Sequence, residues 1–315
     1  MTDMPQMPIS AVICTHNRDL YLGAAIDSLL AQDFAGDFEV VVVDNGSSDR
    51  TREVVEQRSH DPRLKYVFEP VLGLSVARNT GAKIASGEIL AYLDDDAEAS
   101  PRWLQVLWSA YQDNPKLAIA GGKVTLLWPK GHYAPPWLST GLAANLGAYD
   151  LGDNIVYISD PGSTPRGLNY SIRRSFLEEI GGFDTNLGRI GTKLLSHEEL
   201  QMTELALERG MQVAYIPDAL VAHNVAPERL QRSWFLNRGW WQGISDCYRE
   251  ELIGKAGMGQ LLRGSERFLR GLYKSLQYFS DPAERFDKLV YAYGQIGYLN
   301  AAIKGLLSTS KKDHK

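Results

Sequence analysis

Short runs of apolar or β-branched residues recur in the first third of the chain, each followed by polar or glycine residues and then by a segment of helical character. This alternation is typical of an α/β fold, because strands buried on both faces of a parallel sheet are nearly continuous hydrophobic runs. We therefore expect a mostly parallel central sheet flanked by helices. The expected strands are residues 9–14, 40–43, 64–68 and 89–93, and the expected helices are residues 20–32, 50–58, 75–85 and 101–114.

The pattern changes after a fifth expected strand at residues 117–120. Residues 121–167 are rich in Trp, Pro and Gly and indicate loops, with a hairpin as an alternative. A helix at 197–209 and strands at 212–216 and 220–223 are expected next, and the chain has helical character from residue 228 onward. The predicted domains are a main domain at 1–227, with halves at 8–120 and 121–227, and a helical C-terminal extension at 228–315.

The composition argues against several classes of protein. The 315 residues carry a formal net charge of -5, whereas a general nucleic-acid-binding protein needs an excess of Lys and Arg. Two cysteines, Cys14 and Cys247, are too few for a disulfide framework or a Cys-based zinc site, and they fit a reducing cytoplasm. We expect neither a secretory signal nor a membrane-spanning helix, which needs roughly 20 apolar residues in a row.

Polar and acidic residues follow three of the expected strands, at 15–18, at 44–47 and at Asp94, Asp95 and Asp96. In open parallel sheets the ligand binds outside the carboxyl ends of the strands, so these segments should meet at one edge. In an extended chain Asp94 and Asp96 share one face while Asp95 points elsewhere. Two such carboxylates suit a divalent cation that bridges to a diphosphate. The alternative is a solvated acidic turn before the next helix.

Several motifs occur in a particular order and spacing. The first half contains Thr15-His16-Asn17-Arg18, Asp44-Asn45-Gly46-Ser47-Ser48-Asp49, Ala77-Arg78-Asn79-Thr80-Gly81 and Asp94-Asp95-Asp96. The second half contains Gly167-Leu168-Asn169-Tyr170-Ser171-Ile172-Arg173-Arg174, Gly181-Gly182-Phe183-Asp184 and Ser196-His197-Glu198-Glu199-Leu200. Together they resemble the family 2 glycosyltransferases with the A-type nucleotide-sugar-binding fold, over residues 8–245. The resemblance implies a Rossmann-like sheet, with a nucleotide-sugar half at 8–120 and an acceptor half at 121–227.

The resemblance also implies roles for individual residues. It assigns the nucleotide sugar to Thr15, Asn17, Arg18, Asp44, Arg78, Asp94 and Asp95, and a divalent metal, Mn²⁺ or Mg²⁺, to Asp96 and His223. In this scheme Asp44 accepts a hydrogen bond from a base N–H such as that of uracil, and Asp94 contacts the ribose. Structural alternatives stay open: a turn-forming Asp44, solvated arginines at positions 18 and 78, and a buried structural His223.

The implied reaction needs a general base that deprotonates the acceptor hydroxyl, because a nucleoside diphosphate is already a good leaving group. The family places a carboxylate for this at the head of a helix, commonly as Glu-Asp. Here the pair is Glu198-Glu199, so Glu199 matches the base, with Glu198 as the alternative and simple helix-terminal charges as a third reading. Candidates on the acceptor side are Asn169, Trp137, Trp240 and Trp241, although core packing is the alternative for each tryptophan.

The C-terminal region contains an amphipathic segment. Its basic residues recur on one side of a helix, at Arg263, Arg267, Arg270 and Lys274. Its large apolar residues lie on the opposite side, at Phe268, Leu269, Leu272, Tyr273, Leu276 and Phe279. Such a helix can lie in a membrane interface or pack its apolar face on the domain, and both readings stay open.

These features predict an inverting, metal-dependent hexosyltransferase that moves a sugar from a nucleotide sugar to a hydroxyl of a glycan or lipid-linked acceptor in cell-surface polysaccharide synthesis. We expect a UDP-linked donor. The lack of a Gln-x-x-Arg-Trp motif favours transfer of a single sugar. We expect a cytoplasmic protein, with peripheral contact to the inner membrane surface as an open alternative. Competing functions are a catalytically silent nucleotide-sugar-binding subunit and a nucleotidyltransferase, the latter disfavoured because no glycine-rich, lysine-bearing phosphate loop follows the first strand.

Overall fold

The structure is a computed structural model that describes residues 7–191, 194–252 and 254–312. The chain divides into two compact units. The first comprises Met1–Leu127, Gly147–Gly191 and Glu198–Asn224, and the second comprises Trp128–Leu146, Thr192–His197 and Val225–Lys315. The boundary predicted at residue 227, and the predicted halves of the main domain, stay predictions.

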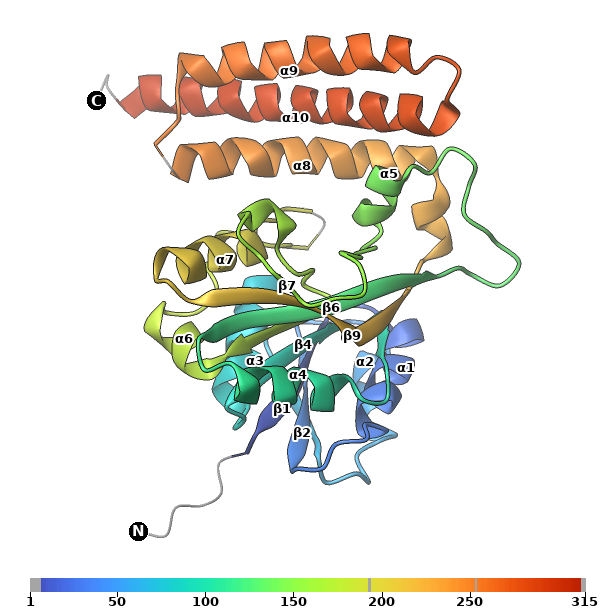
Figure 1. The fold of residues 1–315 in the computed structure, drawn as a ribbon. Helices are drawn as coiled ribbons and strands as arrows, with labels where there is room; N and C mark the ends of the chain where they lie inside the picture. Colours follow the sequence, from blue (N-terminus) through green and yellow to red (C-terminus); the bar gives the residue numbers. More distant parts are fainter. Residues whose placement is uncertain (1–6, 192–193, 253, 313–315) are drawn as a thin grey trace. The chain divides into compact units, whose positions relative to one another are not determined.

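The first unit is built on a mixed sheet (Figure 1). Within the described residues its strands are β1 (Ile9–Thr15), β2 (Phe38–Asp44), β3 (Leu64–Phe68), β4 (Ile89–Asp94), β5 (Ala97–Ala99), β6 (Leu117–Leu127), β7 (Val156–Tyr157), β8 (Asn169–Arg173) and β9 (Gln212–Asn224). They are ordered β3-β2-β1-β4-β8-β6-β9-β5, and β7 pairs with β9. The first four strands pair in parallel, and β8 joins them in antiparallel orientation. The predicted α/β architecture is therefore confirmed.

Helices follow most of these strands, as the alternating pattern predicted. They are α1 (Asp19–Leu30), α2 (Thr51–Glu56), α3 (Leu74–Ile84), α4 (Trp103–Asp113), α6 (Arg174–Glu179) and α7 (Glu198–Glu208), with a 3₁₀ turn at Pro161–Ser163. α3 comes close to the sheet because Gly81 lies against Val12 and Val43, where a Cβ would be 2.6 and 3.2 Å from their side chains. This close packing fixes the helix that carries Arg78.

The expectation of loops throughout residues 121–167 was wrong. β6 continues to Leu127, and the segment also contains α5 (Thr140–Asn145) and β7. Gly121 and Gly122 lie inside β6, where a Cβ on Gly121 would be 2.2 Å from the Asn169 carbonyl and one on Gly122 would be 2.1 Å from the Ala219 carbonyl. Glycine is needed there for the close approach of neighbouring backbone.

The two strands expected at 212–216 and 220–223 form one strand, β9. A register shift against β6, between Gly122 and Val124, absorbs the irregular segment around Pro217. Strands β5 and β8 were not predicted. Both are short, and β8 pairs with residues far away in the sequence, so its local pattern carried little signal.

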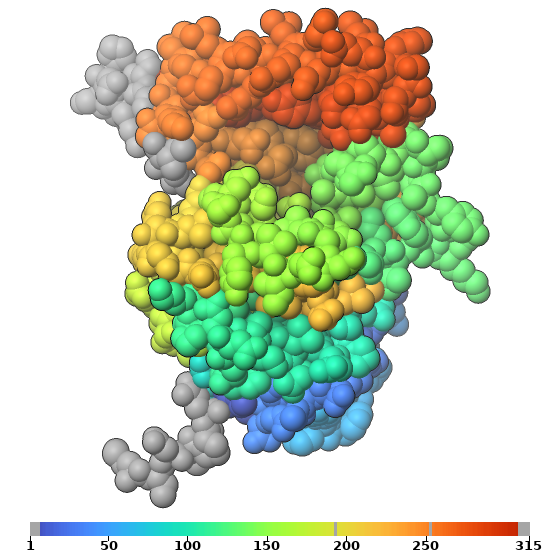
Figure 2. All heavy atoms as spheres, viewed as in Figure 1, coloured from blue at the N-terminus to red at the C-terminus, as the bar shows by residue number. Residues whose placement is uncertain are grey.

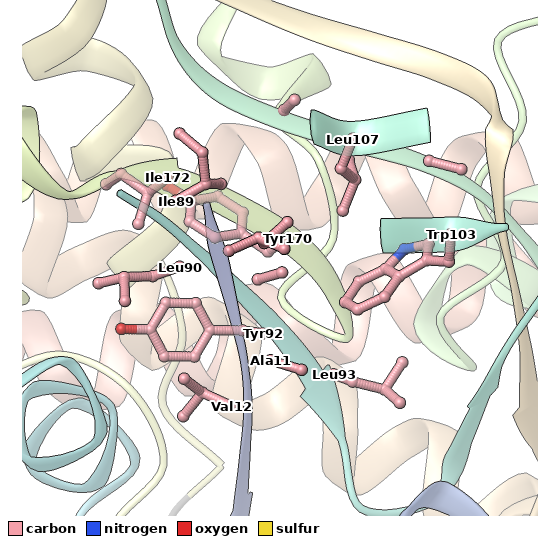
Figure 3. Packing of buried hydrophobic residues seen from close by; sticks show 14 of the residues in the cluster. Ala11, Val12, Ile89, Leu90, Tyr92, Leu93, Trp103, Leu107, Tyr170 and Ile172 are labelled. Atoms are coloured by element: carbon pink, nitrogen blue, oxygen red, sulfur yellow. The ribbon is translucent and has the colours of Figure 1, made fainter. Parts of the chain in front are cut away.

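The core of the first unit lies between the sheet and its helices. Figure 3 shows Tyr92 and Leu93 of β4 near Tyr170 of β8, together with Trp103 and Leu107 of α4. All five side chains are buried. This packing holds the ends of β1, β4 and β8 in fixed positions, and those ends carry the candidate site.

The second unit is helical, as predicted for the C-terminal region. Besides α5 it contains a 3₁₀ turn at Pro227–Leu230 and the helices α8 (Arg232–Leu252), α9 (Met258–Gln277) and α10 (Pro282–Lys312). α10 lies between α8 and α9 (Figure 1). Across the part of the chain that the structure describes, we find no helix with the length and apolarity required to cross a membrane.

Candidate active site

Strand register brings the acidic segments of the sequence to one edge of the sheet. In the β1–β2 pairing Thr15 lies opposite Asp44, and in the β1–β4 pairing Cys14 lies opposite Asp94. The three parallel strands therefore end at the same level. This is the edge at which open parallel sheets bind their ligands.

Asp44 is buried and held at both carboxylate oxygens. The Tyr66 hydroxyl donates a hydrogen bond to Oδ2 at 2.8 Å, and the Ser47 backbone N–H donates to Oδ1 at 2.9 Å. Burial and the neighbouring Asp44 raise the pKa of Tyr66 to about 12, so its hydroxyl remains a donor. The carboxylate thus forms the turn that was one alternative, while each oxygen keeps a lone pair for a further donor such as a base N–H.

The loop after β1 presents the other donor-side candidates. Asn17 has a left-handed backbone conformation (φ 54). Its side-chain oxygen accepts a hydrogen bond from the Ser48 N–H at 2.8 Å, which connects this loop to the loop after β2. Arg18 begins α1 and opposes the negative charge of Asp95. The Thr15 hydroxyl is buried at the same edge, where it favours the ionised form of Asp95. Thr15 and Arg18 therefore lie near Asp95, whereas Asn17 joins the two loops.

Asp94, Asp95 and Asp96 place three neighbouring carboxyl groups at the end of β4. Burial, and then the negative charge of Asp96, raise the pKa of Asp94, and the same two causes raise the pKa of Asp95 to about 7. Asp95 and Asp96 are buried in the turn after the strand. A cation at this position would relieve the repulsion between these carboxylates.

Asp96 and His223 meet because β5 pairs with β9, where Ala97 lies opposite His223. His223 Nε2 is 3.0 Å from Asp96 Oδ1, and both side chains are buried. Among the residues that the structure describes, no group of three or more His, Cys, Asp or Glu side chains is arranged to hold a metal. Mn²⁺ and Mg²⁺ commonly take one or two protein carboxylates and complete their shells with phosphate oxygens, so these residues fit a metal that binds together with a diphosphate.

The second cluster joins α3 to the start of α7. Arg78 Nη2 donates to Glu199 Oε1 at 2.9 Å, and Arg78 Nη1 lies 3.4 Å from Glu198 Oε1. The side chains of Arg78, Glu198 and Glu199 are only 2%, 4% and 16% exposed. One buried arginine thus faces two glutamates, which rules out the solvated-arginine alternative for Arg78.

The two glutamates differ in their protonation. Burial and the charge of Glu199 raise the pKa of Glu198 to about 7. For Glu199 burial acts in the same direction, but the Arg78 guanidinium outweighs it and lowers the pKa below its usual value. Glu199 is therefore the carboxylate that stays ionised at neutral pH, and Glu198 keeps a buried Oε2 with no hydrogen-bond partner in the described part of the chain.

Small and aromatic residues surround this cluster. A Cβ on Gly167 would be 1.9 Å from Glu199 Oε1 and 2.4 Å from Arg78 Nη2. The Arg78 guanidinium also lies 5.4 Å from the ring centre of Phe183 and 5.8 Å from that of Tyr92. Position 167 must stay without a side chain for this geometry to form.

Of the acceptor-side candidates, Asn169 belongs to the first unit and lies opposite Leu93 in the β4–β8 pairing. The Asn169 amide is buried and fully occupied, since it accepts from Trp103 Nε1 at 2.8 Å and donates to the Ala219 and Lys123 carbonyls at 2.7 and 3.2 Å. It ties β8 to its neighbours, which favours a structural role. The three tryptophans belong to the second unit.

Each of these tryptophans packs inside the helical unit, as the core-packing alternative predicted. Trp137 contacts the rings of Phe235 and Phe286 edge-on, at 5.4 and 5.2 Å between ring centres. Trp240 and Trp241 pack against the buried cluster between α8 and α10. Their predicted role toward a sugar acceptor stays a prediction.

Two residues near the site were missed by the sequence analysis. Arg189 is exposed in the loop before α7 and opposes the charges of Asp94, Glu198 and Glu199. A basic residue between the Gly-Gly-Phe-Asp motif and the glutamate pair was the available signal. Tyr66 could be recognised as the partner of Asp44 only from the β2–β3 pairing.

Known proteins resemble this chain in sequence and in fold. The profile of the family described as "Glycosyl transferase family 2" matches residues 10–180. The chain is 29% identical over 258 residues to the glucosyl-dolichyl phosphate glucuronosyltransferase of Haloferax volcanii, a match that covers 79% of this chain and 80% of that protein. It is 45% identical over 106 residues to the validoxylamine A glucosyltransferase of Streptomyces hygroscopicus subsp. limoneus, which covers 33% of this chain and 23% of that protein.

A solved structure shares the fold. The mannosyltransferase PcManGT from Pyrobaculum calidifontis, in complex with GDP-Man and Mn²⁺, superposes with a TM-score of 0.59 at 19% identity, over 97% of this chain and 76% of that one. At this identity the likeness shows the fold alone.

Proposed function

The chain belongs to glycosyl transferase family 2 and is a glycosyltransferase of the hexosyltransferase type, and we propose that it transfers a sugar from a UDP-linked donor, with inversion, to a hydroxyl of a lipid-linked or glycan acceptor in cell-surface polysaccharide synthesis. One observation carries the proposal. The strand-end carboxylates Asp44, Asp94 and Asp96 and the buried glutamate pair belong to the same compact unit. The Haloferax volcanii relative is named for an acceptor of the dolichyl phosphate class, which supports a lipid-linked acceptor.

In the proposed function different residues bind the base, the ribose and the diphosphate of the donor. Asp44, oriented by Tyr66, accepts from the base, and the Thr15 hydroxyl and Arg18 lie beside the same strand ends. Asp94 accepts from the ribose hydroxyls. A metal held by Asp96 and His223 would neutralise the charge on the departing diphosphate.

The glutamate pair supplies the proton acceptor. Glu199 is ionised at neutral pH because Arg78 lowers its pKa, and Glu199 is the more exposed of the two. It takes the proton of the acceptor hydroxyl as that oxygen attacks the sugar carbon, opposite the leaving diphosphate. Arg78 orients both carboxylates. Glu198, with its pKa near 7, is the competing base.

Nucleoside diphosphate release tests the proposal. The wild-type protein is incubated with a panel of nucleotide sugars, acceptor extracts and Mn²⁺ or Mg²⁺. Nucleoside diphosphate release that requires the metal and is lost in Asp96→Asn supports the proposal. The matched control is Asp153→Asn, at a surface position whose side chain is 96% exposed. Donor binding with no release on any acceptor would favour a silent binding subunit. Pyrophosphate released from a nucleoside triphosphate and a sugar phosphate would favour a nucleotidyltransferase.

A further inference from the structure

The buried side of α9 carries two glycines, a serine and a glutamine. The buried positions of this helix are Gln260, Gly264, Gly271 and Ser275, which recur along one side. A Cβ on Gly264 would be 2.7 Å from Leu299, and one on Gly271 would be 3.0 Å from the Ala292 Cβ. Leu261 also packs against the buried cluster that contains Tyr298 of α10.

The opposite side of α9 exposes its large apolar side chains. Five of them are between 63% and 73% exposed, namely Met258, Leu262, Leu269, Tyr273 and Leu276. They recur at helical spacing, and Phe279, just beyond the helix, is 68% exposed. On the face in view in Figure 2, the side chains of α9 form one edge of the orange-to-red helical layer. Phe268 of the predicted apolar face is half-buried and its other members are exposed, and packing of this face on the rest of the protein stays a prediction.

Basic residues lie beside this apolar stripe. Arg263 and Arg267 pair with Glu250 of α8, at 2.6 and 3.0 Å, so they are partly neutralised. Arg270 and Lys274 point to solvent, and the nearest acid to Arg270 is Glu266 at 4.0 Å. These two cations can reach an anionic surface that contacts the helix.

The charge of the chain is divided unevenly along its length. Residues 255–315 contain 11 Lys and Arg but only 5 Asp and Glu, which is a net charge of +6. Since the whole chain carries -5, the preceding residues carry -11. The exposed apolar stripe thus belongs to the one strongly basic region of an acidic protein. Two copies that met through α9 would bring like charges together, which argues against a second copy as the occupant.

We propose that the outer face of α9, formed by Met258, Leu262, Leu269, Tyr273 and Leu276, lies in the interface of an anionic membrane. The apolar stripe would enter the acyl boundary while Arg270 and Lys274 contact lipid phosphates. This inference goes beyond the transfer reaction, and it needs neither donor nor acceptor to be tested. A protein bound to the membrane in this way would encounter a lipid-linked acceptor in the same membrane.

Vesicle flotation with the full chain tests the inference. The probes are vesicles of phosphatidylcholine mixed with phosphatidylglycerol and vesicles of phosphatidylcholine alone. The wild type should float with the anionic vesicles, and Leu269→Glu combined with Leu276→Glu should lower the partition coefficient roughly tenfold or more. Leu20→Glu, at a position on α1 that is 80% exposed, is the matched control and should bind like the wild type. Arg270→Gln with Lys274→Gln should weaken binding to the anionic vesicles and leave the neutral ones unaffected.

A second readout locates the contact. An environment-sensitive fluorophore on Leu276→Cys should shift its emission to the blue when anionic vesicles are added, whereas the same label on Leu20→Cys should not. The native cysteines should react slowly, since burial raises the pKa of both Cys14 and Cys247 to about 12. Equal flotation of the wild type and the double glutamate variant would overturn the inference. A second result would also overturn it: a wild-type protein that does not bind vesicles but sediments as a dimer, and that the same two substitutions convert to a monomer.

Discussion

Arg78 donates a hydrogen bond to Glu199 at 2.9 Å inside the first unit, where the arginine is 2% exposed. The two residues are 121 positions apart, and their contact couples the helix after β3 to the helix that begins with the glutamate pair. The arginine keeps Glu199 ionised but also occupies one of its oxygens. In the proposed reaction the proton therefore goes to the other oxygen or to the remaining lone pair of Oε1.

The pH dependence of the reaction identifies the base. Because Arg78 lowers the pKa of Glu199, this residue stays ionised over about pH 5 to 8, and kcat/KM should show no rise centred near pH 7. Glu199→Gln should lower kcat about 10²- to 10⁴-fold, with Glu198→Gln as the milder matched change. A wild-type rise with a midpoint near 7, lost together with most activity in Glu198→Gln, would instead assign the base to Glu198.

Removing Arg78 should destabilise the first unit. Arg78→Ala leaves two buried glutamates without their cation, which costs about 3–5 kcal/mol of unfolding free energy, measured by urea denaturation. Arg50→Ala, which breaks an exposed pair with Asp19, should cost less than about 1 kcal/mol. In the Arg78→Ala variant the folded-state pKa values of both glutamates should rise above their unfolded values. The extra loss of stability should therefore be small at acidic pH and grow as the pH rises, and a pH-independent loss would contradict this.

The parts of the fold that the sequence predicted are those with a local signal. Strands β1, β2 and β4 each contain an apolar run, and the polar residues at their ends mark the ligand edge of the sheet without any knowledge of pairing. By contrast, the extension of β6 through Gly121 and Gly122 depends on neighbouring carbonyls, which no local pattern reveals.

The contacts of the site residues were harder to predict than their positions. Arg78 was expected on the nucleotide side, but its guanidinium contacts Glu198 and Glu199, which are 120 and 121 positions away, so the tertiary fold sets this contact. For α9 the sequence predicted two faces correctly but could not decide which one packs. Its glycines decide this, since they allow a closer helix contact than the leucines do.

Close contact between α8 and α10 should make Gly243 intolerant of a side chain. A Cβ there would be 1.8 Å from the Gly294 carbonyl oxygen, so Gly243→Ala must separate the two helices, at a cost of about 1–3 kcal/mol or more. Gly259→Ala is the matched control, because the nearest atom to its Cβ is the far end of the flexible Arg263 side chain, and it should be neutral or stabilising by up to about 1 kcal/mol. Thermal unfolding followed by circular dichroism measures both, and equal unfolding temperatures would refute the helix contact.

The hydrogen bond from Tyr66 to Asp44 should tune donor recognition. Tyr66→Phe removes the donor at 2.8 Å that orients Oδ2, so the carboxylate keeps only its bond from Ser47. The lost bond corresponds to about 0.5–1.5 kcal/mol, or roughly a two- to tenfold increase in the KM for the nucleotide sugar, with kcat little changed. Tyr133→Phe, at a residue that is 84% exposed, serves as the control. Asp44→Asn should raise KM further, because it replaces the acceptor itself. If Tyr66→Phe lowered kcat and left KM unchanged, Asp44 would not be the group that receives the base.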